Sequence, residues 1–401
     1  MKTKTEAVVK WFQPIMLACV LVTMTTNARA VGFRLPNQDP VGIARGNAFV
    51  ATADNPSAIY YNPAGITQLE GDQFRAGMYL ISSDTKFTSS LGLGSAHTDS
   101  SFQPVPQLYY SHAFKNTPFT AGLGIYAPFG LGIDWGNNAP FDPMARKGKL
   151  LYATVNPVIA WRALPSLSLA IGPNLNYANA DLQSGMFKFK GDAISAAFTA
   201  GVLWQPHTQW SFGLKYQSWS DLDLEGHSEL PAVPLPTKVD TTASAHIPQS
   251  VTFGVSYRPT TNWNFEVDLD WTDWDSLNTV NFERNDPVFA PVVPFPFNYR
   301  SSWMYEVGVT RQLGNGWSVS AGYIYSENSI PDANFNPLIP DSNLHLGSVG
   351  VGHKGKTWDW DLGYTLAYND KREVTGAVVP LANGTYRTLN HAINLSVTYK
   401  F

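Results

Sequence analysis

Strict alternation of large apolar residues with small or polar residues recurs along this chain and limits its fold more than any other feature. Between Trp263 and Trp271, aromatic and aliphatic residues alternate with Asn264 and three acidic residues, and Trp358 to Tyr368 repeats the pattern. Successive side chains of a strand point to opposite faces. Each such segment therefore predicts a strand of about ten residues with one apolar face and one polar or small face.

The alternation has two explanations, a water-soluble β-sandwich and a membrane β-barrel. Bulky aromatic residues stand at the ends of the apolar faces, which is where a barrel carries its interfacial girdles. Only 14% of the residues are charged, against about 25% in ordinary soluble domains. No stretch after the N-terminal region reaches 18 consecutive apolar residues, so membrane-spanning helices are excluded. The pattern favours the barrel.

Fourteen such strands are expected, separated by linkers that alternate between short and long. The predicted strands are 72–83, 104–115, 118–128, 148–161, 166–179, 193–205, 209–220, 247–258, 262–274, 301–312, 316–327, 342–353, 357–369 and 390–401. An even strand number with short turns at one end and long loops at the other is typical of an outer-membrane barrel. The sequence thus predicts an all-β protein, a 14-stranded antiparallel transmembrane β-barrel over residues 72–401.

The first 30 residues have the layout of a secretory signal peptide. Lysines precede a short apolar stretch from Pro14 to Met24, and Ala28-Arg29-Ala30 supplies a small-residue cleavage site. The single cysteine, Cys19, lies in this leader, so the mature chain is expected to lack disulfides and cysteine-bound metals. The formal net charge of −4 gives no basic footprint for nucleic acid.

Residues 31–71 do not alternate and are predicted to form a separate N-terminal segment. Asp54-Asn55-Pro56 and Asn62-Pro63 each offer an N-cap followed by proline at the first helical position. Phe33, Ile59 and several neighbouring aromatic residues need burial. Such a segment fits inside the barrel as a plug, and a periplasmic tail is the alternative.

Several motifs spread over the mature chain resemble those of one family. They are Val31-Gly32-Phe33, Gly42 to Ala48 (GIARGNA), Tyr61 to Gly65 (YNPAG), Ala127-Pro128-Phe129-Gly130, Ile330-Pro331-Asp332, Pro340-Asp341 and the terminal Phe401. With these motifs the chain resembles the FadL-type outer-membrane transporters of long-chain fatty acids, a group that includes uptake channels for aromatic hydrocarbons such as toluene.

The resemblance implies a monomeric barrel whose lumen holds an N-terminal hatch, and passive uptake of a hydrophobic molecule without a cofactor. The hatch residues that match the family are Phe33, Asn47, Asn62, Pro63, Ala64 and Gly65. The resemblance also implies a kink in the third strand that opens a lateral gap in the wall. Gly122, Gly124, Pro128 and Gly130 are the candidates for this kink, and ordinary close packing plus a turn is the alternative explanation.

The cargo is left open between two classes. A fatty acid needs a cation for its carboxylate, and Lys215 and Arg300 have the parity of inward-facing residues, whereas Arg311 has outward parity. An aromatic hydrocarbon needs no such cation. The apolar loops at 233–236 and 287–297 are expected either to capture cargo or to pack on neighbouring loops and on lipopolysaccharide. By family order, the loops 180–192 and 221–246 are expected to form the first groove.

An enzyme on a barrel scaffold, such as an outer-membrane lipase, is the weaker alternative. The eight histidines show no metal-binding spacing, and Gly350 to Gly355 matches a dinucleotide motif only by chance, because no helix follows it. The expectation is therefore a non-enzymatic channel without a metal. The last strand alternates up to Phe401, which resembles the C-terminal signal for the outer-membrane assembly machinery.

Overall fold

The computed structural model describes residues 32–100, 102–232, 238–286 and 290–401. The predicted signal peptide, residues 1–30, lies outside the described residues. The same holds for Val31 and for the parts 233–237 and 287–289 of the two apolar loops.

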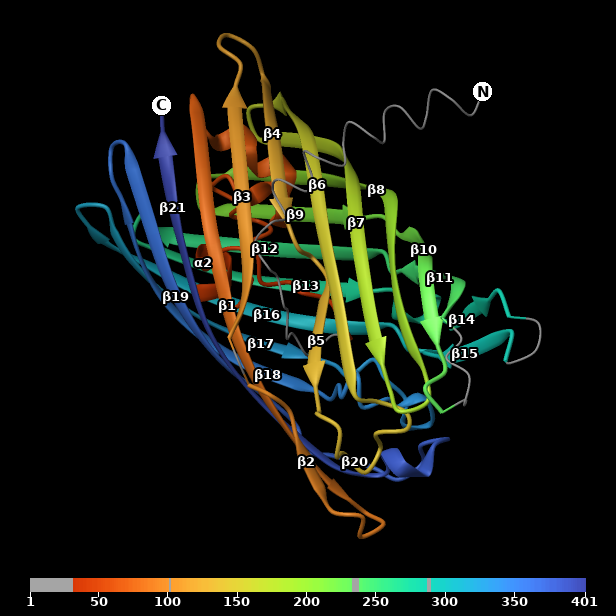
Figure 1. Ribbon diagram of the computed structural model, residues 1–401. Coiled ribbons are helices and arrows are strands. Elements are labelled where there is room, and N and C mark those ends of the chain that lie inside the picture. The colour runs from red at the N-terminus through yellow and green to blue at the C-terminus, as the bar shows by residue number, and fades with distance from the viewer. Residues whose placement is uncertain (1–31, 101, 233–237, 287–289) are drawn as a thin grey trace, which may run out of the picture.

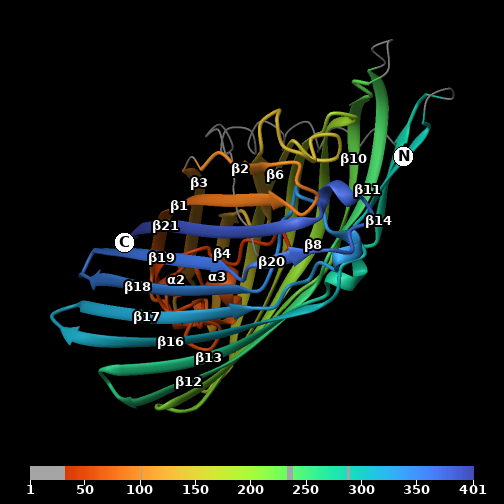
Figure 2. The same ribbon diagram turned by 90° about the horizontal axis from the view of Figure 1, so that it is seen from below.

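Fourteen strands pair with their neighbours in a closed antiparallel ring (Figures 1 and 2). In ring order these strands are β1 (Asp72–Ser89), β3 (Gln103–Ala113), β4 (Phe119–Tyr126), β6 (Lys147–Leu164), β7 (Leu167–Gln183), β8 (Lys188–His207), β9 (Trp210–Gln217), β12 (Ser250–Thr260), β13 (Trp263–Thr272), β16 (Ser302–Gly314), β17 (Trp317–Ser326), β18 (Leu344–Lys354), β19 (Trp358–Asn369) and β21 (Gly384–Lys400). The first strand closes the ring on the last, from Gln73 opposite Lys400 to Ser89 opposite Gly384. The predicted 14-stranded barrel is confirmed.

Seven further strands extend the wall at the end that carries the long loops. They are β2 (Ser95–His97), β5 (Gly130–Asp134), β10 (Ser220–Glu229), β11 (Val239–Ile247), β14 (Thr279–Arg284), β15 (Val292–Pro296) and β20 (Arg372–Val374). The linkers 84–103, 129–147, 221–246, 275–300 and 370–389 were expected to be loops, and that expectation was wrong for the strands they contain. Outward residues such as Asp221, Asp223 and Glu225 are polar, so these strands lack the apolar stripe by which the lipid-facing strands were found.

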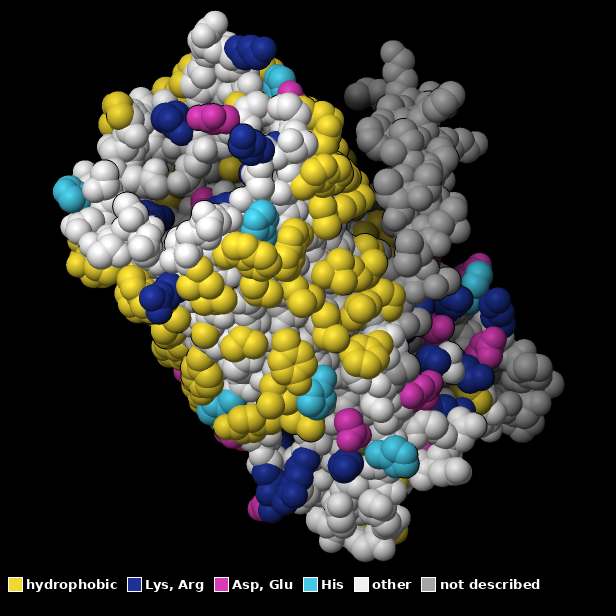
Figure 3. Space-filling model, turned by 90° about the vertical axis from the view of Figure 1, so that its left-hand side faces the viewer, with side chains coloured by type: hydrophobic (Ala, Val, Ile, Leu, Met, Phe, Trp, Pro, Cys, Tyr) yellow, Lys and Arg dark blue, Asp and Glu magenta, His cyan; other side chains and the backbone are white. Residues whose placement is uncertain are grey.

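The two faces of the wall have opposite character. The outward positions of the ring carry exposed aromatic and aliphatic side chains, which form the hydrophobic band in Figure 3. The inward positions carry buried polar residues such as Asn156, Asn174 and Ser256. Among the described residues, no helix has both the length and the hydropathy of a membrane span.

The non-alternating segment folds into short helical turns within the ring of strands (Figure 2). These turns are α2 (Pro40–Ala44), α3 (Ala58–Tyr61) and the 3₁₀ helix η1 (Pro63–Gln68), and further single 3₁₀ turns, η2 (Trp274–Ser276), η3 (Asp332–Asn334) and η4 (Pro380–Ala382), lie in the long loops. Proline opens both α2 and η1, and the side chains of Asp39 and Asn62 cap them. The cap expected at Asn55 instead closes a turn onto Ser57.

Candidate functional site

Buried arginine–carboxylate pairs tie the N-terminal segment to the barrel wall. Arg34 makes a two-pronged contact with Asp270 of β13, with N–O distances of 2.6 and 2.8 Å. Arg45 donates to Glu266 of the same strand at 3.0 Å. On the other wall, Arg75 of β1 donates to Asp39 at 2.6 and 2.9 Å. Removing one partner of such a pair leaves an uncompensated buried charge, so each pair fixes the position of the segment.

The acidic row of β13 also binds backbone N–H groups of this segment. Asp268 accepts hydrogen bonds from Phe49 N at 2.8 Å and Val50 N at 2.9 Å. Glu266 accepts one from Ala51 N at 2.7 Å. These carboxylates therefore satisfy backbone donors that no helix or sheet pairs.

Inward-facing glycines of the wall allow the segment to approach the strands closely. A Cβ at Gly322 of β17 would lie 2.0 Å from the backbone carbon of Arg45, and one at Gly213 of β9 would lie 2.1 Å from Val50 O. A real side chain at either position would push the segment away. Sequence reasoning missed these contacts, although glycine at an inward strand position was a signal that could have found them.

Four of the six predicted hatch residues are consecutive, and two of them, Asn62 and Pro63, contact strand β8. Asn62 donates through its Nδ2 atom to Val50 O at 2.8 Å and to Val202 O of β8 at 2.9 Å. Pro63 packs against Gly201 of β8, and a Cβ atom on that glycine would lie 2.9 Å from the proline ring. Ala64 N donates to Asn62 Oδ1 at 3.2 Å. Gly65 leaves room for Ala53, because a Cβ atom on Gly65 would lie 2.3 Å from the carbonyl oxygen of Ala53.

The other two predicted hatch residues lie apart from this contact. Asn47 has a φ of 59° and donates to Asn37 Oδ1 at 2.7 Å. Phe33 packs edge-on against Trp274 at 5.0 Å and contacts Phe129 at 5.9 Å, measured between ring centroids. All six predicted hatch residues therefore lie in the N-terminal segment, but they make their contacts in different parts of it.

The third strand is broken between β4 and β5. Strand β4 pairs with both β3 and β6, whereas β5 pairs with β6 only among the described residues. The N-terminal segment takes the free edge, because Leu35 N donates to Pro128 O at 2.7 Å and Gly130 N donates to Phe33 O at 2.9 Å. The break therefore lies at Pro128 and Gly130, two of the four predicted kink residues.

The other two predicted kink residues do not lie at the break. Gly122 and Gly124 sit in the regular part of β4, paired with β3 and β6. A Cβ at either glycine would lie 2.8 Å from the side chain of Ile59 in α3. Their assignment to the kink was wrong: they admit Ile59, which is the close-packing alternative.

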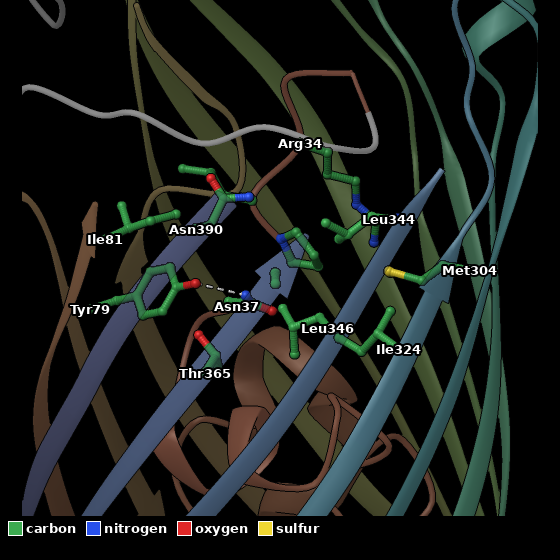
Figure 4. Close-up of a pocket in the computed structure, with 13 residues that line it drawn as sticks. Arg34, Asn37, Tyr79, Ile81, Met304, Ile324, Leu344, Leu346, Thr365 and Asn390 are labelled. Atoms are coloured by element: carbon green, nitrogen blue, oxygen red, sulfur yellow. Dashed lines mark hydrogen bonds between the residues drawn. The ribbon is translucent and has the colours of Figure 1, made fainter. Parts of the chain in front are cut away.

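A small cavity of about 40 Å³ lies between the N-terminal segment and the wall (Figure 4). Its lining is mainly aliphatic, and Asn37 and Tyr79 are joined across it by a hydrogen bond of 2.9 Å. The lining residues are Arg34, Leu35, Pro36, Asn37, Tyr79, Ile81, Met304, Ile324, Leu344, Leu346, Thr365, Ala367 and Asn390. Binding sites of drug-sized ligands occupy about 300–1,000 Å³, so this cavity is closed to such a ligand as it stands.

A larger pocket of about 240 Å³ opens among the long loops. Met144, Phe187, Phe295 and Phe335 contribute to its lining, and so does the segment 182–187. Part of the expected loop groove, 180–192, is therefore present in this pocket. None of the described residues of the segment 221–246 lines this pocket, and most of them belong to β10 and β11.

The two candidate cations differ in position. Lys215 of β9 is buried, and its Nζ lies 4.0 Å above the ring of Tyr60. In the part of the chain that the structure describes, Lys215 makes no ion pair. Arg300 is exposed, next to a loop that precedes β16, so the expectation that it faces inward was wrong. Arg311 is exposed and stacks over Trp263 at 5.2 Å, as its outward parity predicted.

Lys215 and Arg34 line the same small space beside the break. A cavity of about 20 Å³ is bounded by both cations together with Pro128, Phe129 and Tyr60. Burial raises the pKa of Tyr60 to about 12, so its hydroxyl is neutral at physiological pH. Arg34 also lines the 40 Å³ cavity and therefore lies where the two cavities meet.

No metal centre is evident in residues 32–100, 102–232, 238–286 and 290–401, where no three His, Cys, Asp or Glu side chains are grouped suitably. The interior is instead a set of small cavities around a tightly anchored segment.

Several known proteins are similar to this chain in sequence or in fold. The long-chain fatty acid transport protein of Escherichia coli O6:H1 is 21% identical, with 85% of this chain and 87% of that protein aligned. Outer membrane protein P1 of Haemophilus influenzae is 24% identical over 90% and 91% of the two chains. The crystal structure of a Pseudomonas aeruginosa FadL homologue has a TM-score of 0.83 at 18% identity, covering 92% of this chain and all of that one.

The Pseudomonas putida toluene transporter TodX has the same fold, with a TM-score of 0.73 at 14% identity over 94% of this chain and 100% of that one. The family model described as "Outer membrane protein transport protein (OMPP1/FadL/TodX)" matches residues 21–401. Because that match spans nearly the whole chain, the protein belongs to the OMPP1/FadL/TodX family of outer-membrane transport proteins.

Proposed function

We propose that this barrel takes up long-chain fatty acids across the outer membrane, with residues 31–71 acting as its hatch. The observation that carries the proposal is Lys215, a buried lysine without an ion pair in the described part of the chain, which lines a small, mainly polar cavity beside the strand break. An unpaired buried charge is costly, and a carboxylate brought by the cargo would offset that cost.

The route begins at the 240 Å³ pocket among the long loops. Transfer of an alkyl chain from water to an apolar surface is favourable by about 0.8 kcal/mol per CH₂, so the aromatic lining of this pocket can capture a chain from outside. The next step is the 40 Å³ cavity beside Leu35 and Asn37. That cavity must widen to admit cargo, and the stretch 34–37 is the part of its lining that lies outside the strands.

The break between β4 and β5 supplies the exit. Leu35 N donates to Pro128 O, Gly130 N donates to Phe33 O, and Gln38 Nε2 donates to Ala127 O, and these hydrogen bonds cover the free edge there. When the stretch 34–37 moves to widen the cavity, those bonds are lost as well. One displacement would therefore both admit cargo beside Lys215 and uncover the edge of the wall.

An aromatic hydrocarbon is the second candidate cargo, favoured by the likeness of the fold to the toluene transporter TodX. Such a molecule has no carboxylate, so its uptake would not depend on Lys215. Family members are transport proteins, and we propose no enzymatic activity for this chain.

Uptake of labelled oleate and labelled toluene by cells that make the protein tests the proposal. Lys215→Met should lower oleate uptake severalfold and leave toluene uptake unchanged, and Lys215→Arg should retain most oleate uptake. Lys190→Met, a loss of charge at an exposed position of β8, is the matched control. Equal oleate uptake by wild type and Lys215→Met would refute the carboxylate role. Toluene uptake without oleate uptake would establish the second cargo.

A further inference from the structure

An outward-facing row of basic side chains crosses three neighbouring strands at the long-loop end. Lys86 of β1 is directly opposite Arg387 of β21 on one side and His97 of β2 on the other. All three residues are exposed. Residues directly opposite in antiparallel strands have Cα atoms about 4.5–5.5 Å apart, so the three side chains form one continuous row.

This row lies just beyond the hydrophobic band of the barrel. The outward residues of β21 are apolar from Val397 to Leu389 except for His391, and Arg387 is the next outward position. On β1, the outward stretch from Phe74 to Lys86 rises about 30 Å at the strand rise and tilt usual in barrels, whereas the apolar band is about 25 Å tall. Figure 3 shows basic side chains at the lower edge of the hydrophobic band, which is the edge toward the long loops. Lys86 and Arg387 therefore lie at the level of the lipid headgroups.

The surroundings of the row suit a phosphorylated sugar. The next outward-facing row, two residues farther along the strands, consists of hydroxyl residues, with Thr88 opposite both Ser95 and Thr385. One acid is close, because Asp84 Oδ2 lies 3.6 Å from Lys86 Nζ. Glu373, opposite Thr385, is already paired with Lys371.

Lys86 and Arg387 are like charges directly opposite each other on neighbouring strands, and such a pair destabilises a sheet. Asp84 offsets part of this repulsion from the side of Lys86, and an anion placed between the two cations would offset more. On the other wall at the same end the outward rows are mixed, with Glu225 opposite Asp192 and the exposed Lys190 opposite the exposed His227. The row at β1 differs because it places two residues that are always charged, Lys86 and Arg387, directly opposite each other.

We propose that Lys86, Arg387 and His97 bind the phosphate of an anionic glycolipid in the outer leaflet, whose acyl chains lie along the apolar face of β21. The side chains of Lys86 and Arg387 donate to the phosphate oxygens, and the hydroxyl row contacts the sugar. A basic residue at a membrane surface strengthens binding of an anionic headgroup about fivefold. The pair should therefore contribute about 30-fold.

Binding of fluorescent lipopolysaccharide to the purified full chain in neutral detergent tests the proposal. The double variant Lys86→Gln/Arg387→Gln should bind about 30-fold more weakly than wild type, and Arg387→Gln alone about fivefold. The matched control is Lys115→Gln/Arg311→Gln, two exposed cations at the short-turn end, which should bind like wild type. The mobility shift of folded barrels on heating confirms that each variant is folded.

Two further arms identify the ligand. Dephosphorylated lipopolysaccharide should bind wild type as weakly as intact lipopolysaccharide binds the double variant, and inorganic phosphate should not displace the intact lipid. Equal binding of the double variant and wild type, or equal binding of both lipids to wild type, would overturn the proposal. Full displacement by inorganic phosphate would overturn the assignment to a lipid. None of these measurements depends on the cargo, so their failure would be distinct from failure of the proposed transport.

Discussion

The contact between Arg34 and Asp270 anchors the first described residues of the N-terminal segment to the wall. Asp270 also accepts a hydrogen bond from Thr252 at 2.9 Å, and Arg34 donates to Thr272 at 2.7 Å. Asp270→Asn keeps the size of the side chain and removes its charge. Arg34 is then left buried without its partner, and we expect the stretch from Phe33 to Leu35 to detach locally while the barrel stays closed.

The magnitude follows from burial. Both side chains of the pair are 5% exposed, and removing one partner of a buried ion pair costs about 3–5 kcal/mol. Glu306 lines the same cavity as Arg34 and Asp270 and can take over part of the interaction, so the lower end of that range applies. A loss of about 3 kcal/mol increases local opening more than 100-fold.

Hydrogen–deuterium exchange at single amides measures this opening. The amides of Leu35 and Gly130, which bond across the strand break, should exchange more than 100-fold faster in Asp270→Asn. The amide of Ile43, bonded to Asp39 O within α2, should keep its rate, because α2 is anchored separately. The apolar double variant Arg34→Met/Asp270→Leu should restore most of the protection. Unchanged exchange at Leu35 and Gly130 would refute the reasoning, and faster exchange at Ile43 would show that the segment moves as one body.

Two further predictions concern close packing and pH. Gly322→Leu should raise the conductance of the barrel in planar bilayers, because a side chain there meets the backbone of Arg45 and displaces the N-terminal segment. Gly347→Leu is the control, since a Cβ there meets nothing within 4 Å, and it should conduct like wild type. Equal conductance of wild type and both variants would contradict the prediction. Burial raises the pKa of Asp341 in the long loop before β18 to about 6, so the folded form binds a proton more readily than the unfolded form. The contribution of Asp341 to the free energy of unfolding should therefore fall by about 3 kcal/mol as the pH rises from about 4 to 6. Asp341→Asn should remove this fall in urea unfolding at several pH values, and an unchanged pH profile would disprove the assignment.

The barrel could be predicted because lipid imposes a visible rule on sequence. Every strand that faces hydrocarbon must alternate, and Trp263 to Trp271 shows this without ambiguity. Beyond the membrane the rule no longer applies, since both faces of a strand can be wet. For this reason β10, β11, β14 and β15 were expected as loops.

The interior was harder to predict because its contacts join residues far apart in the chain. The motif around Asn62 pointed to a segment that enters the barrel, but the partner of Asn62, Val202, lies in β8 and follows no local pattern. Gly122 and Gly124 were assigned to a kink from residue type alone, although glycine serves close packing equally well. Parity placed Lys215 correctly and failed for Arg300, which lies just outside the regular strand.

The pairing of β1 with β21 has a consequence for biogenesis. Since the last residues of the chain supply the strand that seals the cylinder, the interior is enclosed only after the whole polypeptide is present. The segment that fills the bore belongs to the opposite terminus and is anchored to both β13 and β1. The fold therefore encloses the earliest described residues in a ring that the latest residues complete.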